Sequence, residues 1–273
     1  SLQGDVNTFR GDLSFRPASS SDAPRVVFNQ GSGNANSAAS GTYEGVISGA
    51  RSVLKAGNGT LPLHSTHTYT GGTTISQGTL QLKNDGRILG DVVNDGVLAF
   101  EFFRDVFNGK VTGSGAVRLD SSDITLTADN TYSGGTTLEG GSTLQLGNGG
   151  SSGAIRGDVN LNAGQSMLAF NRTDTLAFDG VISGDGGVRQ LGTGTTILTG
   201  ANTYRGETSI SAGMLSVSQN ENLGAASGRL LLDGGTLRTT GAFATDRQNS
   251  LVAATGTLQT DADLTVNDLV DGI

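Results

Sequence analysis

The chain reads ADNTYSGGTTL at residues 128–138 and GSTLQLG at residues 141–147. The stretch joins a tyrosine, a glycine pair and a Thr-rich alternating run to a glycine turn and a second alternating run. Similar strings surround Tyr69 and Tyr204, so the three marker tyrosines lie 63 and 72 residues apart. Self-similarity at a long period predicts an architecture of stacked, similar units.

Further blocks recur in the same order between the tyrosine strings. Gly-Asp-Val begins at residues 4, 90 and 157, and an aromatic-x-Gly block begins at residues 43, 107 and 178. A Thr- and Leu-containing strand then leads into each tyrosine string. One unit therefore holds about three coils of about 20–25 residues each, and the unit occurs about four times, counting partial copies at both ends.

The composition indicates an all-β chain. There are 44 Gly, only 3 Pro and 15% charged residues in 273, and no window sustains the apolar period of an amphipathic helix. Short alternating runs separated by Gly and Asn are typical of strands and turns. Disorder is the alternative for a Gly-rich polar chain, but Val, Leu, Ile and Phe recur regularly in nearly every segment, which favours a folded structure.

The strands are too short to form independent hairpins, so they must be stabilised by stacking. Coil on coil, their inward-facing Leu, Val, Ile and Phe residues would build one apolar column. At about 4.8 Å per coil, about 11–13 coils would make a rod about 55 Å long. We therefore expect residues 1–273 to form one continuous β-solenoid.

Charge and residue usage exclude several classes of partner and site. The net charge of −8 and the pI near 4.6 disfavour binding to nucleic acid or to an anionic membrane surface. The absence of cysteine excludes disulfides and thiolate metal sites, and no apolar run approaches the roughly 18 residues of a membrane helix. We expect no cofactor and no metal site.

Four strings resemble a known repeat. They are YTGGTTI at 69–75, LAFNRTD at 168–174, GVISG at 180–184 and LTGANTYRG at 198–206. They are similar to the autotransporter-associated β-strand repeat in passenger domains of type V secretion proteins of Gram-negative bacteria. The resemblance implies a right-handed, single-stranded parallel β-helix. It also implies a place on the extracellular side of the outer membrane or secretion from the cell, and adhesion or self-association as frequent roles.

The resemblance makes the chain a fragment of a longer passenger domain, since no signal peptide opens it and no C-terminal membrane domain follows. The function expected of it is that of an adhesin for host cells or extracellular matrix, with fibronectin, collagen or integrin as examples of partners. A rigid stalk and a self-association module, acting in aggregation or biofilm, are the alternatives. Contact of this fragment itself with a membrane is not expected.

A polysaccharide-active enzyme is a further alternative, because parallel β-helices also host such enzymes. Their chemistry needs paired carboxylates on one face. Asp120, Asp123 and Asp129 are close in sequence but do not recur at coil spacing, and the chain has no Trp to stack on sugars. The string GGSSG at residues 149–153 matches a nucleophile elbow only formally, because that motif needs a strand-to-helix turn and a histidine. We expect no enzymatic activity.

Two segments interrupt the repeat and are expected to be loop insertions, residues 17–24 and residues 29–42. Insertions in solenoids leave the corners on one face, which is often the binding face. A tolerated surface loop is the other interpretation. The two histidines, His64 and His67, lack carboxylate or cysteine neighbours, so we expect surface residues rather than metal ligands.

Two Arg-Gly-Asp triplets are candidate receptor contacts. Arg and Asp displayed from a tight turn could bridge an acidic group and a metal ion of a receptor such as an integrin. Arg10, Gly11 and Asp12 form the better candidate, because they align with a turn. In the triplet at residues 156–158, Asp158 begins the Gly-Asp-Val block, and we expect it to serve the backbone of a corner.

Phe102 and Phe103 stand where the matching coil has Arg172 and Thr173. If side chains alternate along the strand, one phenylalanine must point outward. An exposed aromatic at a corner is either a binding hot spot or a local packing variant, and the sequence leaves both interpretations open.

Overall fold

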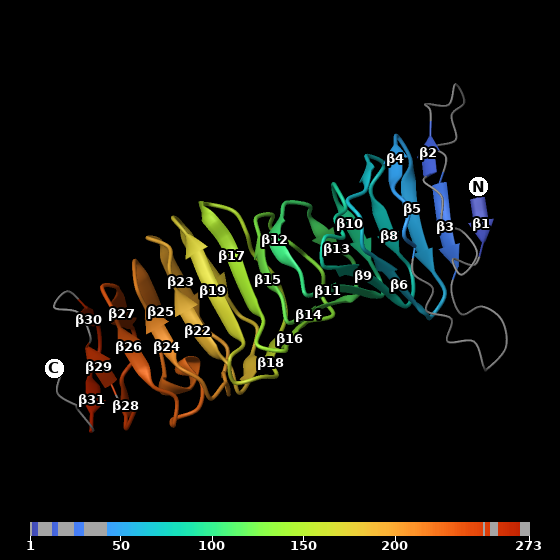
Figure 1. Ribbon diagram of the computed structural model, residues 1–273. Helices are drawn as coiled ribbons and strands as arrows, with labels where there is room; N and C mark the ends of the chain where they lie inside the picture. The colour runs from blue at the N-terminus through green and yellow to red at the C-terminus, as the bar shows by residue number, and fades with distance from the viewer. Residues whose placement is uncertain are drawn as a thin grey trace.

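The computed structural model describes the backbone of residues 2–4, 13–15, 25–29, 43–247, 249–251 and 256–267. Within these residues every regular element is a β-strand, apart from one 3-10 helix, η2 (Asn220–Leu223). All strand pairs are parallel, and the strands stack into an elongated solenoid of about 11 turns (Figure 1). The predictions of an all-β chain and of a parallel β-solenoid are confirmed.

Three large sheets form the main faces. The first contains β1 (Leu2–Gly4), β3 (Arg25–Asn29), β5 (Ser52–Ala56), β8 (Thr73–Ile75), β10 (Val92–Asn94) and β13 (Val111–Thr112). The second contains β6 (Thr60–Leu63), β9 (Thr79–Lys83), β11 (Val97–Glu101), β14 (Ala116–Asp120), β16 (Thr136–Glu139), β18 (Val159–Leu161) and β21 (Ile182–Gly184). The third contains β12 (Arg104–Phe107), β15 (Asp123–Leu126), β17 (Thr143–Gly150), β19 (Met167–Arg172), β22 (Gly187–Gln190), β24 (Thr208–Ile210), β26 (Leu230–Leu232) and β29 (Asn249–Leu251).

Smaller sheets complete the described turns. One contains β2 (Leu13–Phe15), β4 (Ile47–Gly49) and β7 (Thr68–Tyr69). Another contains β20 (Thr175–Phe178), β23 (Thr195–Leu198), β25 (Met214–Val217), β27 (Thr236–Thr239) and β30 (Thr257–Thr260). A further pair is β28 (Phe243–Thr245) with β31 (Leu264–Val266). The strands β12, β20 and β28 are each the first strand of a sheet, and their first residues lie 71 and 68 residues apart. These spacings are close to the 63 and 72 residues between the marker tyrosines of the three-coil repeat.

The coils are slightly shorter than the sequence predicts. Stacked partners from β4 onward are 18 residues apart at the closest, as for Leu80 and Leu98, and 24 at the widest, as for Leu144 and Leu168. The partners in β3 and β5 are 27 residues apart, which is wider than between the strands that follow. Asn29 itself ends β3, whereas residues 30–42 and the segment 17–24 lie outside the described part of the chain.

The core is one apolar column that runs along the solenoid axis. Inward side chains alternate with outward ones, as in β5 and β14, where the second and fourth residues are buried. The marker tyrosines Tyr69, Tyr132 and Tyr204 are fully buried with the strand Leu, Val and Ile residues. Each buried aliphatic side chain contributes about 1.5–3 kcal/mol relative to exposure, so the stacking of coils supplies the stability that a single short strand lacks.

A polar corner residue two positions before each tyrosine links one coil to the next. The Oδ1 atoms of Asn130 and Asn202 accept the backbone N–H groups of Val111 and Ile182, each at 2.8 Å. In the first unit His67 takes this place, and its Nδ1 accepts the N–H of Ile47 at 3.1 Å. Each unit therefore needs a hydrogen-bond acceptor at this position, because the buried backbone N–H of the preceding coil would otherwise be unpaired.

The prediction that both histidines lie on the surface is wrong for His67, which is fully buried, and His64 is partly exposed. The ring of His67 lies between Tyr43 and Tyr69, with ring centroids 6.2 and 6.4 Å away. Burial lowers the pKa of His67 to about 4, because an apolar site disfavours the charged imidazolium. This burial was missed because His67 stands where the other units have Asn130 and Asn202, and a lone histidine is not a typical core residue.

Candidate binding surface

A column of left-handed corner residues follows the strands of the second sheet. Asn84, Phe102 and Ser121 have φ angles of 54°, 50° and 51°, and Gly140 continues the column with 60°. The N–H of Phe102 donates to the carbonyl oxygen of Asp120 at 3.0 Å, and Asn84 and Ser121 make the equivalent bonds one coil away on either side. The corner therefore has a fixed backbone geometry that Gly and Asn adopt easily.

Phe102 is the bulky exception in this column. A left-handed conformation costs a residue with a Cβ atom about 1–2 kcal/mol, and the Phe102 side chain is also 55% exposed. Phe103 is only 2% exposed and packs on Phe100, with ring centroids 5.4 Å apart. The prediction that one phenylalanine of the pair points outward is confirmed, and the outward residue is Phe102.

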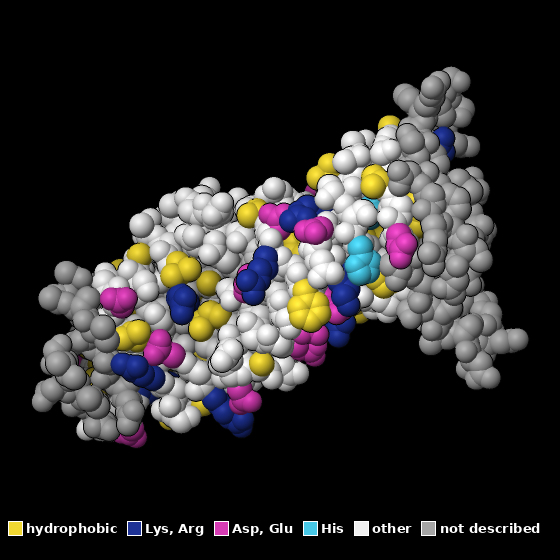
Figure 2. Space-filling view, viewed as in Figure 1, with side chains coloured by type: hydrophobic (Ala, Val, Ile, Leu, Met, Phe, Trp, Pro, Cys, Tyr) yellow, Lys and Arg dark blue, Asp and Glu magenta, His cyan; other side chains and the backbone are white. Residues whose placement is uncertain are grey.

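A basic side chain lies over the exposed ring, and charged pairs lie near it along the chain. The Nζ of Lys83 lies 5.8 Å from the Phe102 ring centroid and 2.6 Å from the Oε1 of Glu101. Two residues after Phe102, the guanidinium of Arg104 pairs with the carboxylate of Asp123 at 3.3 Å. The described face in Figure 2 shows this mixture of apolar, basic and acidic side chains on the rod. An exposed phenylalanine with a basic side chain against its ring is a candidate interface residue, because aromatic residues are enriched in the cores of interfaces.

Two hollows lie beside the free edges of β12 and β20. The first hollow has a volume of about 280 Å³ and is lined by Leu82, Arg87, Ile88, Leu89, Gly90, Phe103, Asp105, Val106, Phe107, Asn108 and Gly109. The second hollow measures about 690 Å³ and is lined by Asp129, Asn130, Thr131, Ala154, Ile155, Arg156, Gly157, Asp158, Arg172, Leu176, Ala177, Asp179 and Gly180. The linings are equivalent in part, since residues 105–109 of the first and residues 176–180 of the second belong to or follow β12 and β20 at the same places in successive repeat units.

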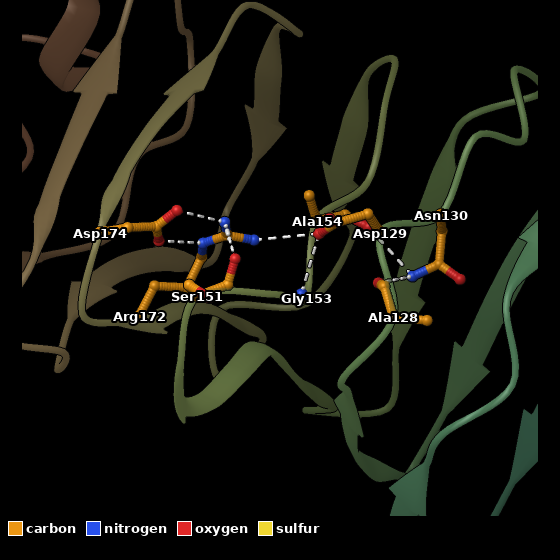
Figure 3. A network of polar contacts seen from close by, with 8 residues as sticks. All are labelled: Ala128, Asp129, Asn130, Ser151, Gly153, Ala154, Arg172 and Asp174. Carbon is orange, nitrogen blue, oxygen red and sulfur yellow. Dashed lines mark hydrogen bonds and ion pairs between the residues drawn. The ribbon is translucent and has the colours of Figure 1, made fainter.

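Arg172 forms one wall of the second hollow and fixes the glycine-rich segment behind it (Figure 3). Its side chain is 8% exposed. The guanidinium makes a bidentate contact to Asp174, with both N–O distances 2.8 Å, and reaches Asp129 at 3.1 Å and the carbonyl oxygen of Ser151 at 2.6 Å. Asp129 also accepts the N–H of Gly153 at 3.0 Å.

The hydrogen bonds from Arg172 lower the pKa of Asp174 below its ordinary value, because they favour the ionised carboxylate. The buried guanidinium thereby joins three segments: the one after β15 through Asp129, the one after β17 through Ser151, and the one before β20 through Asp174. A planar five-donor group is suited to this task, since it satisfies several acceptors at once.

The triplet at residues 156–158 lies in the lining of the second hollow. The Oδ1 of Asp158 accepts the N–H of Val181 at 2.8 Å, as the Oδ1 of Asp91 accepts the N–H of Lys110 at 2.8 Å in the preceding unit. The prediction that Asp158 serves a backbone corner is confirmed. Arg156 is exposed, and its guanidinium makes no hydrogen bond or ion pair within the described ranges. The triplet Arg10-Gly11-Asp12 lies outside the described residues.

The formal nucleophile-elbow match does not have the required local structure. Ser151 follows β17, its carbonyl oxygen accepts from Arg172, and no helix follows it before β18. Across the part of the chain that the structure describes, no three His, Cys, Asp or Glu side chains converge in a way that would hold a metal ion. The same residues include no helix of the length and hydrophobicity needed to cross a bilayer.

The sequence located Phe102 but not the reason for its exposure. The left-handed column could have been inferred from Asn84 and Gly140, which each follow a strand at the same place in the repeat and belong to types that tolerate positive φ. No sequence pattern indicates the hollows. They lie beside β12 and β20, the first strands of two sheets, where the preceding turn of the solenoid has no strand to pair with them.

Comparison with known proteins agrees with the repeat analysis. The family model described as Passenger-associated-transport-repeat matches residues 53–82, 112–146 and 188–217. The chain is also 38% identical over 121 residues to a protein of Brucella suis biovar 1 (strain 1330) described as Adhesin BmaC autotransporter. That alignment covers 42% of this chain and 4% of the relative, so the chain spans a small part of that protein's length. No solved structure matches the chain significantly.

Proposed function

We propose that this autotransporter passenger domain acts as an adhesive rod, displayed on the bacterial cell surface or secreted from the cell. Its ligand would be a component of the host cell surface or extracellular matrix, and fibronectin, collagen and integrins form the first panel to test. The similarity to a protein described as an adhesin supports this proposal. The rod shape supports it as well, because a solenoid presents long faces to its surroundings.

The observation that carries the proposal is the state of Phe102. Its backbone is held in a conformation unfavourable for a residue with a Cβ atom, and its ring is exposed to water. Both features reduce stability, whereas Asn84 or Ser121 satisfy the same corner without a large exposed ring. Backbone strain of this kind supports a hypothesis of function, since residues that cost stability concentrate at functional sites.

Adhesion by such a rod would be multivalent. A weak contact at one corner gains affinity when many copies stand on one surface, because the second contact forms at a high effective concentration. The Lys83–Glu101 ion pair beside Phe102 would then set the orientation of the ligand and the salt dependence of binding. No enzymatic step is part of the proposal, which needs only surface contacts.

A solid-phase binding assay tests the proposal. The chain, the Phe102→Asn variant and the Val93→Asn variant are applied to immobilised fibronectin, collagen and integrin and to host cells. Val93 is an exposed apolar residue at the outward position of β10 and serves as the matched control. We expect saturable binding that Phe102→Asn weakens at least about fivefold, equivalent to about 1 kcal/mol, and that Val93→Asn leaves unchanged.

The assay also separates the two alternative roles. A rigid stalk would bind none of the immobilised ligands or cells. A self-association module would bind only to an additional surface coated with the chain itself. Equal binding by the chain and by Phe102→Asn would refute the proposal that Phe102 contacts the ligand. Binding to none of the surfaces would refute the adhesive role of this region.

A further inference from the structure

The strand β12 leaves one edge of the third sheet open. It is the first strand of that sheet, and β15 pairs with it on one side. The carbonyl oxygen of Phe103 accepts the N–H of Asp123, which begins β15, at 2.9 Å. Because the peptide groups of a strand alternate in direction from residue to residue, the N–H and carbonyl groups of Arg104 and Val106 point to the open edge.

The open edge of β12 offers mainly hydrogen-bond acceptors. The N–H of Val106 donates to the Oδ1 of Asp105 at 2.8 Å, and Arg87 pairs with the same carboxylate. Within residues 43–247, the carbonyl oxygens of Arg104 and Val106 receive no hydrogen bond from another segment. A strand edge with two unpaired carbonyl groups on one side matches the N–H groups of an extended backbone.

The first hollow lies beside this edge, and its lining is largely apolar. Two of its apolar side chains are exposed to water, Leu89 at 49% and Val106 at 40%. The others are buried, namely Leu82, Ile88, Phe103 and Phe107. With a volume of about 280 Å³, the hollow has room for an apolar side chain, which would exchange water for an apolar lining.

The second repeat unit shows that the fold does not need these exposed apolar residues. Leu89 precedes a Gly-Asp-Val block where the second unit has Arg156, and Val106 is the third residue of β12 where Ala177 is the third residue of β20. Arg156 and Ala177 are also exposed. An exposed leucine and valine beside one hollow are therefore typical of an interaction surface rather than of a packing requirement.

We propose that the open edge of β12 and the first hollow bind an extended segment of a partner protein. The segment adds one strand to the third sheet, donates N–H groups to the carbonyl oxygens of Arg104 and Val106, and places an apolar side chain in the hollow. Strand addition to a free sheet edge is a general mode of peptide recognition. A second copy of the chain is not the occupant, because a four-residue edge and two exposed side chains provide far less than the roughly 800 Å² per partner of a stable interface.

The test is an NMR titration of the full chain with the peptide acetyl-Thr-Leu-Thr-Leu-Thr-amide. We expect saturable shifts of the Leu89, Arg104, Val106 and Asn108 amides, with half-saturation at about 1 mM. Two analogues serve as controls: acetyl-Thr-Ser-Thr-Ser-Thr-amide lacks the apolar side chains, and the fully N-methylated peptide lacks the backbone donors. Both should bind at least about fivefold more weakly. Amides of residues 175–180 should stay unchanged, because charged side chains line the second hollow and disfavour an apolar ligand.

Two variants complete the titration, and each introduces the residue type that the second unit has at the same place, Arg156 or Asn160. Leu89→Arg should weaken binding of the peptide at least about fivefold, whereas Val93→Asn, on the first sheet, should not. Unchanged spectra elsewhere show that both variants are folded. Absence of saturable shifts at about 10 mM peptide, roughly ten times the expected half-saturation, would overturn the proposal, as would undiminished binding by Leu89→Arg or of either analogue. The titration uses no host ligand and leaves Phe102 in place, so its outcome is independent of the adhesive role.

Discussion

The hydroxyl oxygen of Tyr132 lies 2.7 Å from the Oγ1 atom of Thr136, and both side chains are buried in the core. The same contact joins Tyr69 to Thr73 at 2.5 Å and Tyr204 to Thr208 at 2.6 Å. Burial raises the pKa of Tyr132 above its ordinary range, which keeps the hydroxyl protonated. A tyrosine followed four residues later by a threonine is therefore a structural device of the repeat.

This contact predicts a specific pattern of stabilities. Tyr132→Phe should lower the free energy of unfolding by about 1–2 kcal/mol, because Thr136 loses its buried partner. Thr136→Val should cost a similar amount, for the same reason. The double variant should be less destabilised than the sum of the single variants, as a double-mutant cycle by urea unfolding would measure. Strict additivity would contradict a direct interaction between the two hydroxyl groups.

The corner at Phe102 predicts a gain of stability on substitution. Phe102→Asn should raise the free energy of unfolding by about 1 kcal/mol, since asparagine tolerates positive φ. Thermal unfolding of the variant and the parent chain measures the difference. Phe103→Asn is the matched control and should destabilise by about 3 kcal/mol or more, because it removes a buried ring. A destabilised Phe102→Asn variant would contradict the assignment of strain to this corner.

His67 predicts acid sensitivity of the first unit. Its pKa is about 4 in the folded chain and 6.5 for the ordinary group. Between these pH values the unfolded chain takes up a proton that the folded chain excludes, so the free energy of unfolding falls as the pH falls from 6.5 to 4. The shift sets an upper limit of about 3 kcal/mol on this loss.

The measurement compares thermal unfolding of the chain and His67→Asn at pH 7.5 and pH 4.5. Asparagine is the residue that the other units use, as Asn130 and Asn202, and it does not titrate. The variant should lose less stability than the parent chain on acidification, and its remaining pH dependence reports the carboxylates. An identical loss in both proteins would show that His67 does not titrate in this range.

Replacement of Arg172 should loosen the structure locally rather than along the whole chain. Arg172→Met should free the segment Gly147–Gly153, because the contact to the Ser151 carbonyl and the fixed position of Asp129 are lost. The global cost should be about 1–2 kcal/mol, since Asp174 and Asp129 are partly exposed and regain water. Hydrogen exchange should accelerate at residues 147–155 and stay unchanged near Tyr69. Uniform acceleration along the chain would contradict a local role.

The sequence was sufficient to predict the architecture because the repeat acts at every level. Apolar alternation, glycine corners and the Tyr–Thr pair recur together, so local and long-range preferences agree. The burial of His67 could not be predicted, because one residue departs from the repeat while keeping only its acceptor function. The second hollow could not be predicted either, because it depends on where β20 starts relative to the coil before it.

The measurement that tests the in-register stack most directly is a spin-label distance between Val106 and Leu231. These residues are 125 positions apart, yet they share one column of the third sheet through six successive pairings. The chain has no cysteine, so Val106→Cys and Leu231→Cys give unique labelling sites on outward positions. At about 4.8 Å per coil, the stack predicts a narrow distribution near 29 Å. A broad distribution, or one centred beyond about 50 Å, would contradict the stack on which the binding surfaces depend.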